Sequence, residues 1–480
     1  MKGRFAVVFD FYAQRPRWSP TPDDEQLQHT TIEVPRDYSE PDGERITLAL
    51  SRRRATVPGR RRGILLGVNG GPGGDWGLGR ALPDKFAATP LQEVYDLIGF
   101  DPRGTGESTN LLAEVTVPRA PFDSRPPDSA FEILAQDMRL REEACARAGG
   151  ELRRHISTPN TARDMDVIRG VLAEERLNFV GYAYGAYVGA VYGTLFPARL
   201  DRSVLDSCVH PDWTWREQFL WQGEAVQRNV ERWARWTADR NGTFGLGLFP
   251  AQVLGTVEEV AQGLEVLGHN DPQLRTLFDG AVGNRAADRG QWAELALLVA
   301  RLQSSPHDAE TCRALLARQG TWRPLDSEGE LRVGVLEATT LEHAWPCDLE
   351  VYYQDMRDFR KRFPYGYGVL RAQPWVGAFR TFEAPQAPVA PIREGYPVGL
   401  VVQADGDPMD HYAGGVAMAE RLGHHLLTVQ DSGEHEVYVL GDNPYVDAVV
   451  HRYLVDGELP APRASCPGRT SRPNVPADHD

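Results

Sequence analysis

Short apolar runs alternate with amphipathic stretches over the first 208 residues of the chain. The runs are rich in Val, Ile, Leu and Phe and have the length of buried strands, whereas apolar positions in the stretches between them recur with the period of a helix. The predicted strands are Thr31–Val34, Ile46–Leu50, Ile64–Val68, Val94–Phe100, Asn178–Tyr182 and Ser203–Leu205. The predicted helices are Phe131–Ala148, Ala162–Glu174 and Ala186–Leu195. This alternation predicts an α/β fold with a mostly parallel sheet flanked by helices.

The pattern changes at about residue 209, where strand signals stop and helical sequence rich in tryptophan begins. Alternation then resumes, and its elements are a strand Val398–Gln403, a helix Tyr412–Leu422, a strand Leu426–Val429 and a helix Pro444–Tyr453. After about residue 460 the chain is rich in Pro, Arg, Ser and Asp, which is typical of a loosely held tail. We therefore predict an α/β core in two parts, 1–208 and 396–460, a large inserted helical cap at 209–395, and a flexible tail at 461–480.

Composition and charge narrow the classes of partner. The chain has 480 residues, 41 % of them hydrophobic and 25 % charged, with a net charge of −15. Such a composition supports a folded core and excludes a disordered chain. The negative charge disfavours binding to nucleic acid or to an anionic membrane, because the long-range field repels phosphate. A small molecule or a short peptide is the better candidate, and the sequence does not indicate an oligomeric state.

Nothing in the sequence indicates export, a membrane span, a metal or a cofactor. Asp10 ends the first apolar run before it reaches the length of a signal sequence, and no window approaches roughly 18 uncharged apolar residues. The five cysteines form no CxxC pair, which favours reduced thiols. The motif Glu434-His435-Glu436 lacks a third ligand at a suitable spacing for zinc. We expect a cytoplasmic protein.

A glycine-rich loop, Asn69-Gly70-Gly71-Pro72-Gly73-Gly74, follows the predicted strand Ile64–Val68 directly. Glycine lets the backbone approach a ligand closely and present its N–H groups. A phosphate-binding loop is the competing reading, but no Gly-Lys-Ser/Thr follows. A purely structural turn stays open as an alternative.

The second motif is Gly181-Tyr182-Ala183-Tyr184-Gly185, placed between a predicted strand and a predicted helix. The flanking glycines permit the sharp strand-to-helix turn that holds the nucleophile of G-x-S-x-G hydrolases above the sheet. Here the middle residue is Ala183, and a methyl group cannot attack a carbonyl. The chain as it stands should therefore not catalyse by this route.

Two loops of the second half supply an acid and a histidine. Asp407 follows the predicted strand Val398–Gln403, and His435 lies 28 positions later. The chain order of nucleophile position, acid and histidine is the order of an α/β-hydrolase. In that reading His435 takes the proton of the nucleophile and Asp407 fixes its tautomer. A calcium loop or an ordinary acidic turn is the alternative, but the set of acidic residues that a calcium loop needs is incomplete.

Together the motifs resemble a known family. The glycine-rich loop, Gly99–Ser108, Asn160–Arg169 and Gly181–Tyr192 are similar, in that order, to the tripeptidyl-aminopeptidase-like branch of the α/β-hydrolases, which is related to prolyl aminopeptidases. The resemblance runs from about Thr31 to Cys466 and weakens in the insertion. It implies an α/β-hydrolase fold with a helical cap and an exopeptidase-like amide or ester hydrolase.

The resemblance also implies roles by position. Ala183 occupies the nucleophile position, where serine is expected, Asp407 is the acid and His435 is the base. The backbone N–H groups of Gly71 and Tyr184 would form the oxyanion hole.

Further positions follow from the same resemblance. Asp101 and Arg103 are expected to brace their loop rather than to touch substrate. Glu342, Asp348 and Glu350 are the candidates to hold a substrate ammonium, with a solvated face as the alternative. Independently of the resemblance, the many tryptophans of the predicted cap and Trp76 beside the glycine-rich loop suggest an apolar or ring-bearing acyl group.

Three explanations of Ala183 compete. The chain is an inactive Ser→Ala variant of an enzyme, a natural protein without catalysis, or an enzyme in which Tyr184 or Cys208 took over. Neither of those two residues occupies the tip of the turn. The glycines, the glycine-rich loop, the acid and the histidine are all intact, which favours the first explanation. The predicted function is thus a serine hydrolase that acts through an acyl-enzyme, aminopeptidase-like, on a small peptide or peptide-like natural product. A ligand-binding protein without catalysis and a carboxylesterase are the alternatives.

Overall fold

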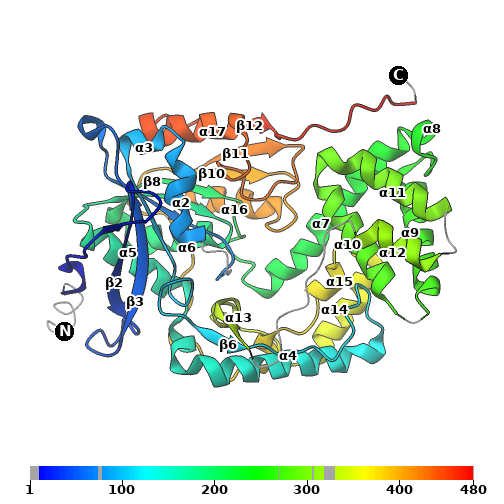
Figure 1. Cartoon of the computed structure of the whole chain (residues 1–480), viewed down its shortest axis with the longest axis horizontal. Coiled ribbons are helices and arrows are strands. Elements are labelled where there is room, and N and C mark those ends of the chain that lie inside the picture. Colours follow the sequence, from blue (N-terminus) through cyan, green and yellow to red (C-terminus); the bar gives the residue numbers. More distant parts are fainter. Residues whose placement is uncertain (1–9, 74–77, 270, 305–307, 318–329, 479–480) are drawn as a thin grey trace.

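The computed structural model describes residues 10–73, 78–269, 271–304, 308–317 and 330–478. Its centre is a ten-stranded sheet in the order β1-β2-β3-β5-β4-β7-β8-β10-β11-β12 (Figure 1). The first three strands and β5 pair in antiparallel fashion, and the others pair in parallel. The strands are β1 (Ser19–Pro20), β2 (Leu27–Pro35), β3 (Arg45–Arg53), β4 (Ile64–Val68), β5 (Asp96–Phe100), β7 (Leu177–Tyr182), β8 (Leu200–Asp206), β10 (Leu400–Ala404), β11 (His425–Gln430) and β12 (Arg463–Pro467).

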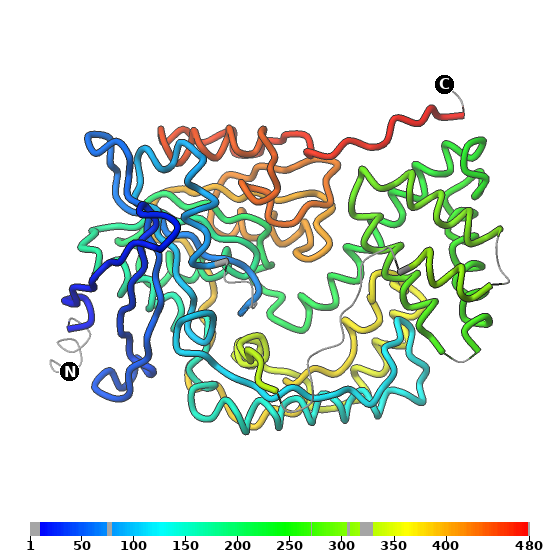
Figure 2. The backbone as a smooth tube through the Cα atoms, viewed as in Figure 1, coloured from blue at the N-terminus to red at the C-terminus, as the bar shows by residue number. Residues whose placement is uncertain are grey.

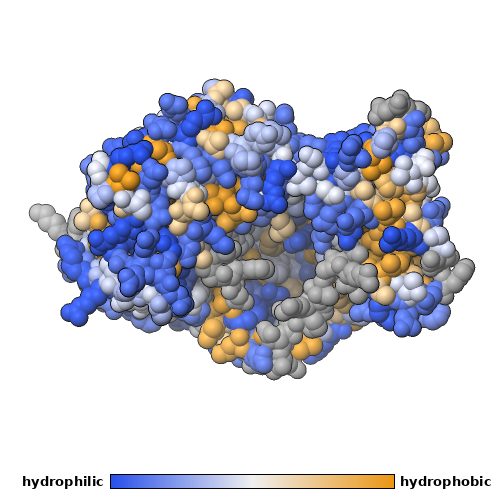
Figure 3. All heavy atoms as spheres, turned by 45° about the horizontal axis from the view of Figure 1, so that its top comes forward, coloured by the Kyte–Doolittle hydropathy of each residue, from blue (hydrophilic) through white to orange (hydrophobic). Residues whose placement is uncertain are grey.

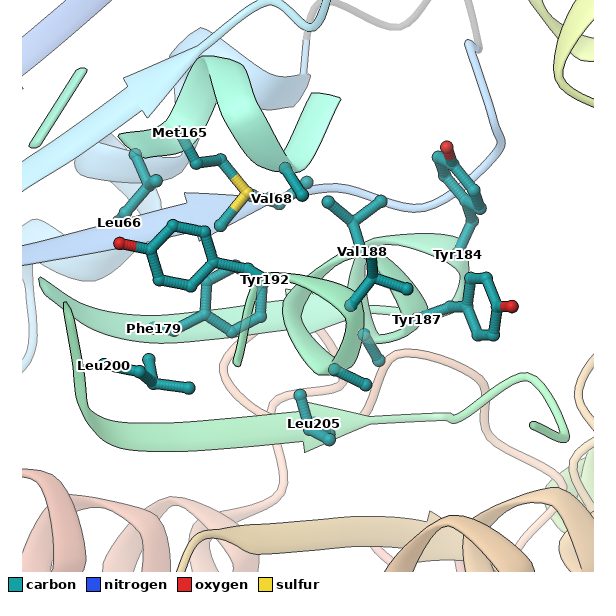
Figure 4. Close-up of a cluster of buried hydrophobic side chains, with 14 of the residues drawn as sticks. Leu66, Val68, Met165, Phe179, Tyr184, Tyr187, Val188, Tyr192, Leu200 and Leu205 are labelled. Atoms are coloured by element: carbon teal, nitrogen blue, oxygen red, sulfur yellow. The ribbon is translucent and has the colours of Figure 1, made fainter. Parts of the chain in front are cut away.

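The central strands of this sheet carry apolar residues on both faces, so helices cover both faces of the sheet. Alternate residues of β4 show this, since Leu66 belongs to one apolar cluster and Leu65 to another. The first cluster contains α5 (Thr158–Val171), α6 (Tyr184–Leu195) and α16 (Tyr412–Leu422), and Figure 4 shows α5 and α6 packed on β4, β7 and β8. The second contains α2 (Leu78–Ala87), α3 (Leu91–Val94) and α17 (Pro444–His451). The predicted α/β fold is confirmed.

A separate helical body with its own core follows β8. It contains the long helix α7 and α8 to α12, and Trp233 and Trp292 are fully buried among them. Figure 2 shows this body beside the sheet domain. It is joined to that domain through α7 and, at the bottom of the view, through the third group of elements described in the next paragraph. Its helices are α7 (Arg216–Ala238), α8 (Asn241–Phe244), α9 (Pro250–Leu267), α10 (Gln273–Ala287), α11 (Trp292–Ser304) and α12 (Ala309–Ala317).

A third group of elements connects the two bodies. It holds α13 (Val335–Thr340), α14 (Leu349–Arg362), α15 (Gly368–Arg371) and the two-stranded sheet of β6 (Leu112–Glu114) and β9 (Leu331–Val333). Helix α4 (Asp128–Gly149) packs here too, since its Phe131 shares a cluster with Met356. The helical layer therefore draws on a segment within 1–208 as well, and the boundaries of the predicted domains stay predictions.

Two of the differences between the predicted and the observed elements concern strands of the sheet. The strand predicted at Val94–Phe100 begins only at Asp96, because α3 occupies the residues before it. The flexible tail predicted at 461–480 is wrong for Arg463–Pro467, which forms β12 and pairs in parallel with β11. Among the described residues no helix has both the length and the apolar character needed to span a bilayer.

Candidate active site

The turn between β7 and α6 is held in a strained conformation. Ala183 has φ 50° and ψ −118°, a region that residues other than glycine rarely adopt. The turn is tight on both sides: a Cβ on Gly181 would lie 2.6 Å from the Gly185 carbonyl oxygen, and one on Gly185 would lie 2.4 Å from the Val68 carbonyl oxygen. Only glycine fits at these two positions. Backbone strain of this kind costs about 1–3 kcal/mol and persists at functional sites.

The glycine-rich loop reaches the tip of this turn. A Cβ on Gly70 would lie 2.8 Å from Cβ of Ala183, so the loop backbone passes directly against the residue at the tip. Gly71 adopts φ 126°, which favours glycine. Gly71 and Tyr184, the two predicted oxyanion-hole residues, line the same cavity as Ala183. Their positions suit that role, which stays a prediction.

Asp407 and His435 form a hydrogen-bonded pair. Asp407 follows β10 and its side chain is fully buried, and His435 Nδ1 donates to Asp407 Oδ2 at 2.9 Å and lies 3.1 Å from Oδ1. The acid is itself fixed, because its Oδ1 accepts the backbone N–H groups of Met409 (2.8 Å) and Asp410 (3.0 Å). This is the acid-to-histidine geometry of a catalytic triad.

A second buried carboxylate holds the loop that carries the histidine. Asp206 ends β8 and accepts the backbone N–H groups of Tyr438 (2.6 Å) and Val437 (3.3 Å) and the Ser207 hydroxyl (2.9 Å). The Ser207 hydroxyl oxygen accepts the backbone N–H of Glu436 at 2.9 Å. Burial raises the pKa of Asp206 to about 7, against the donors that oppose it. The position of His435 thus depends on the end of β8.

Two more carboxylates surround His435. Asp410 Oδ2 lies 4.0 Å from His435 Nε2, and Glu436 is the next residue in the chain. Burial lowers the pKa of His435, but Asp407 and then Asp410 and Glu436 raise it further, to about 10. Burial also raises the pKa of the Asp410 and Glu436 carboxyls. The carboxylates around His435 therefore favour the protonated form of its imidazole.

Ala183 and His435 open into one cavity of about 490 Å³, which we call the nucleophile-side cavity. Helix α7 closes it with Phe219 and two glutamines, together with Trp215 directly before the helix, so the core and the helical layer build it jointly. Figure 3 shows the surface hollowed between the two bodies. The lining residues are Asn69, Gly70, Gly71, Pro72, Ala183, Tyr184, Val209, Trp215, Gln218, Phe219, Gln222, Leu336, Thr340, Met409, Asp410, His435 and Glu436.

The predicted ammonium-binding residues lie elsewhere. Asp348 caps α14 by accepting the backbone N–H of Glu350, and Glu350 is exposed and pairs with Arg357. Glu342 is buried one layer behind the cavity. None of the three predicted carboxylates lines the nucleophile-side cavity as the described residues form it. Trp76 lies outside the described residues.

Glu342 has its own set of donors. It accepts the Thr158 backbone N–H (2.9 Å), the Thr158 hydroxyl (2.8 Å) and the indole N–H of Trp215 (3.2 Å). Burial raises its pKa to about 7, although these donors oppose the shift. Trp215 lines the cavity, so Glu342 positions the cavity wall.

Sequence reasoning missed Asp410 and Glu436 as cavity residues. Both lie within motifs chosen for their neighbours, three positions after Asp407 and one after His435. Their closeness in sequence to Asp407 and His435 is the signal that could have identified them. The predicted bracing role of Arg103 is confirmed, because its buried guanidinium donates to both oxygens of Asp164 at 2.7 and 2.6 Å.

Comparisons with known proteins identify the family of the chain. The family model described as alpha/beta hydrolase fold matches residues 63–262, and the one described as TAP-like protein matches residues 376–466. A tripeptidyl aminopeptidase of Streptomyces lividans is 32 % identical over 471 residues, which cover 93 % of this chain and 85 % of the relative. A serine protease of Mycobacterium tuberculosis is 28 % identical over 458 residues (91 % and 86 %). Carboxylesterase B of the same species is 28 % identical over 460 residues (91 % and 85 %).

Proposed function

Since the chain belongs to the TAP-like family of α/β-hydrolases, we propose that it carries the site of a serine hydrolase that cleaves an amide or ester bond through an acyl-enzyme, with Ala183 in place of the nucleophilic serine. The observation that carries this proposal is the His435–Asp407 pair, 2.9 Å apart, in one cavity with the strained turn at Ala183. A protein that had long ceased to catalyse would have no reason to keep a strained turn opposite a paired histidine.

With serine at position 183 the reaction follows from the arrangement. The serine hydroxyl loses its proton to neutral His435 and attacks the substrate carbonyl, and the Gly71 and Tyr184 N–H groups stabilise the oxyanion. The imidazolium gives that proton to the leaving amine or alcohol, and the acyl-enzyme remains. Water then attacks the acyl-enzyme by the same route in reverse, which releases the acid and restores the serine.

The charges in the cavity support a substrate with a free amine. Asp410 and Glu436 are the carboxylates of the nucleophile-side cavity, and an ammonium group placed beside them would neutralise part of the charge that raises the pKa of His435. This favours an aminopeptidase-like activity on short peptides or peptide-like compounds, in line with the tripeptidyl aminopeptidase that the chain resembles. We place the reaction in the cytoplasm, with a metabolic or biosynthetic substrate.

The test is the change Ala183→Ser. The variant should form one covalent adduct with a fluorophosphonate at residue 183 and should hydrolyse aminoacyl or peptidyl amides faster than the Ala183 chain by roughly 10⁶-fold. The matched control is Ala183→Ser combined with His435→Gln, which should neither label nor turn over. If Ala183→Ser alone neither labels nor hydrolyses any acyl amide or ester, the proposal is wrong.

Two further results separate the alternatives. N-acetylation of the peptide should abolish turnover by an aminopeptidase, whereas equal turnover of both forms would favour an esterase of the carboxylesterase B type. Tight binding of a ligand to the Ala183 chain, without hydrolysis after Ala183→Ser, would favour a binding protein.

A further inference from the structure

A second cavity of about 490 Å³ adjoins the nucleophile-side cavity. The two share His435, Met409 and Gln222, but Ala183 lines only the first. The second is built by α7, α10 and α15 together with the loops around Gly433 and Thr470. Three arginines line it, Arg289, Arg371 and Arg469, and we call it the arginine cavity.

Two of these arginines already have partners. Arg289 is buried and donates to the Asn229 side chain (3.0 Å) and to two backbone carbonyls. Arg469 donates to the Gly441 carbonyl at 2.9 Å.

Arg371 differs, because within the described ranges its guanidinium makes no hydrogen bond, ion pair or ring contact. Surrounding protein nevertheless lowers its pKa through burial, with no acidic side chain near enough to raise it. It is half-buried and lies at the end of α15. A partly buried guanidinium without a protein partner still reaches the cavity and can pair with an anionic ligand there.

The acids that line the same cavity are occupied. Asp288 accepts the Gly290 backbone N–H (2.9 Å) and the Gln291 amide (2.7 Å). Glu434 accepts the Ser432 hydroxyl at 3.0 Å. These donors are neutral, so both carboxylates keep their charge, but neither pairs with Arg371. The lining thus holds three arginines against two carboxylates, and Arg371 is the arginine left to pair with a ligand.

The chemistry of the triad indicates which part of the substrate the arginine cavity would hold. Histidine hands its proton to the leaving group, so the leaving group must lie against His435. The acyl part must lie at residue 183, in the nucleophile-side cavity. A cavity that touches His435 without touching Ala183 therefore lies on the side of the leaving group.

We propose that Arg371 binds a carboxylate on the leaving-group side of the substrate, so that the chain selects peptides with an anionic group beyond the scissile bond. This rests on the proposed hydrolase function and extends it. The carboxylate is the C-terminus of a short peptide or an acidic side chain, and guanidinium pairs with either through two parallel hydrogen bonds. The substrate would lie with its amine toward Asp410 and Glu436 and its carboxylate toward Arg371.

The first experiment measures binding to the Ala183 chain, which cannot consume its ligand by the serine route. Tetra-alanine, tetra-alanine amide and the amide of Ala-Ala-Ala-Asp are titrated by calorimetry into this chain and into its Arg371→Gln variant. The free acid should bind on the order of 10- to 100-fold more tightly than tetra-alanine amide, and Arg371→Gln should abolish that preference. Arg469→Gln is the matched control and should keep it.

The three peptides distinguish the two sources of the carboxylate. Tight binding of the Asp-containing amide, lost in Arg371→Gln, assigns the subsite to an acidic side chain. Tight binding of the free acid alone assigns it to the C-terminus. Equal binding of all three peptides, or a preference that survives Arg371→Gln, overturns the proposal.

The second experiment is independent of hydrolysis and of peptide affinity. Phenylglyoxal modifies free guanidinium groups, and mass spectrometry reads the modified residues. Arg371 should react faster than Arg289, and N-acetylalanine should slow that reaction while N-acetylalanine amide should not. If Arg371 is unreactive or unprotected, there is no carboxylate subsite. If it is protected while Ala183→Ser proves inert, the subsite stands and the proposed hydrolase function fails.

Discussion

Replacing Asp407 by asparagine should lower the pKa of His435 by roughly three units. The imidazole Nδ1 donates to Asp407 Oδ2 at 2.9 Å, and the pKa of His435 is about 10. Two unit charges roughly 4 Å apart in an effective dielectric of about 20 interact by about 4 kcal/mol, and each pKa unit corresponds to about 1.4 kcal/mol. Asp410 and Glu436 remain and still favour the imidazolium, so the pKa should fall from about 10 to roughly 7.

The assay is a titration of the imidazole resonances by NMR between pH 5 and 11, with the His435→Gln variant identifying the signal of His435. Asparagine keeps an oxygen that can accept the Met409 and Asp410 N–H groups, so the loop should hold its shape. An unchanged melting temperature checks this point.

Asp405→Asn provides the control in the same loop. Asp405 pairs with Arg232 at 3.0 Å and does not touch His435, so its replacement should move the pKa of His435 by less than about 0.5 unit. A shift below about one unit for Asp407→Asn would refute the reasoning, because the negative charge at Nδ1 would then not be what holds the proton.

Three further outcomes can be measured separately. Gly70→Ala would place a methyl 2.8 Å from Cβ of Ala183, so in the Ala183→Ser background it should slow fluorophosphonate labelling by about 100-fold, read by intact mass. Asp164→Ala leaves the buried guanidinium of Arg103 unpaired and should cost about 3–5 kcal/mol in urea unfolding, and a cost below about 1 kcal/mol would contradict that account. The raised pKa of His435 adds stability that is complete below pH 6.5 and lost as pH rises through about 10, so the melting temperature should fall more over that range than in His435→Gln.

The sheet could be predicted well because its strands are buried on both faces and read as continuous apolar runs. Strand β4 (Ile64–Val68) was predicted with its observed bounds for this reason. Strand β12 gave no such signal, since Arg463–Pro467 lies at the edge of the sheet and buries only Cys466. Its pairing with β11 is a non-local contact that a local pattern cannot show.

The residues of the site also fall into those that the sequence could predict and those that it could not. Ala183, Asp407 and His435 could be found because they lie in turns whose sequence is constrained by backbone geometry and chain order. The residues predicted to bind an ammonium could not be placed from sequence, because the wall of a cavity depends on how the helical layer sits against the sheet. Arg371 belongs to this class, since no local motif marks a guanidinium as unpaired.

The net charge of −15 suggested only which polymers to exclude as partners, but the arrangement of charges near His435 suggests the direction in which a peptide binds. Asp410 and Glu436 line the cavity that contains Ala183, and Arg371 lines the neighbouring cavity, with His435 in the wall of both; we propose that these are the two sides of the scissile bond. A free peptide carries its ammonium and its carboxylate at opposite ends, so only one orientation satisfies both sides. An ammonium beside the carboxylates would also lower the pKa of His435, because it opposes the charges that hold the proton. Binding in the productive direction would thus help to convert the histidine into the base that the reaction needs, whereas an N-acetylated peptide would leave it protonated.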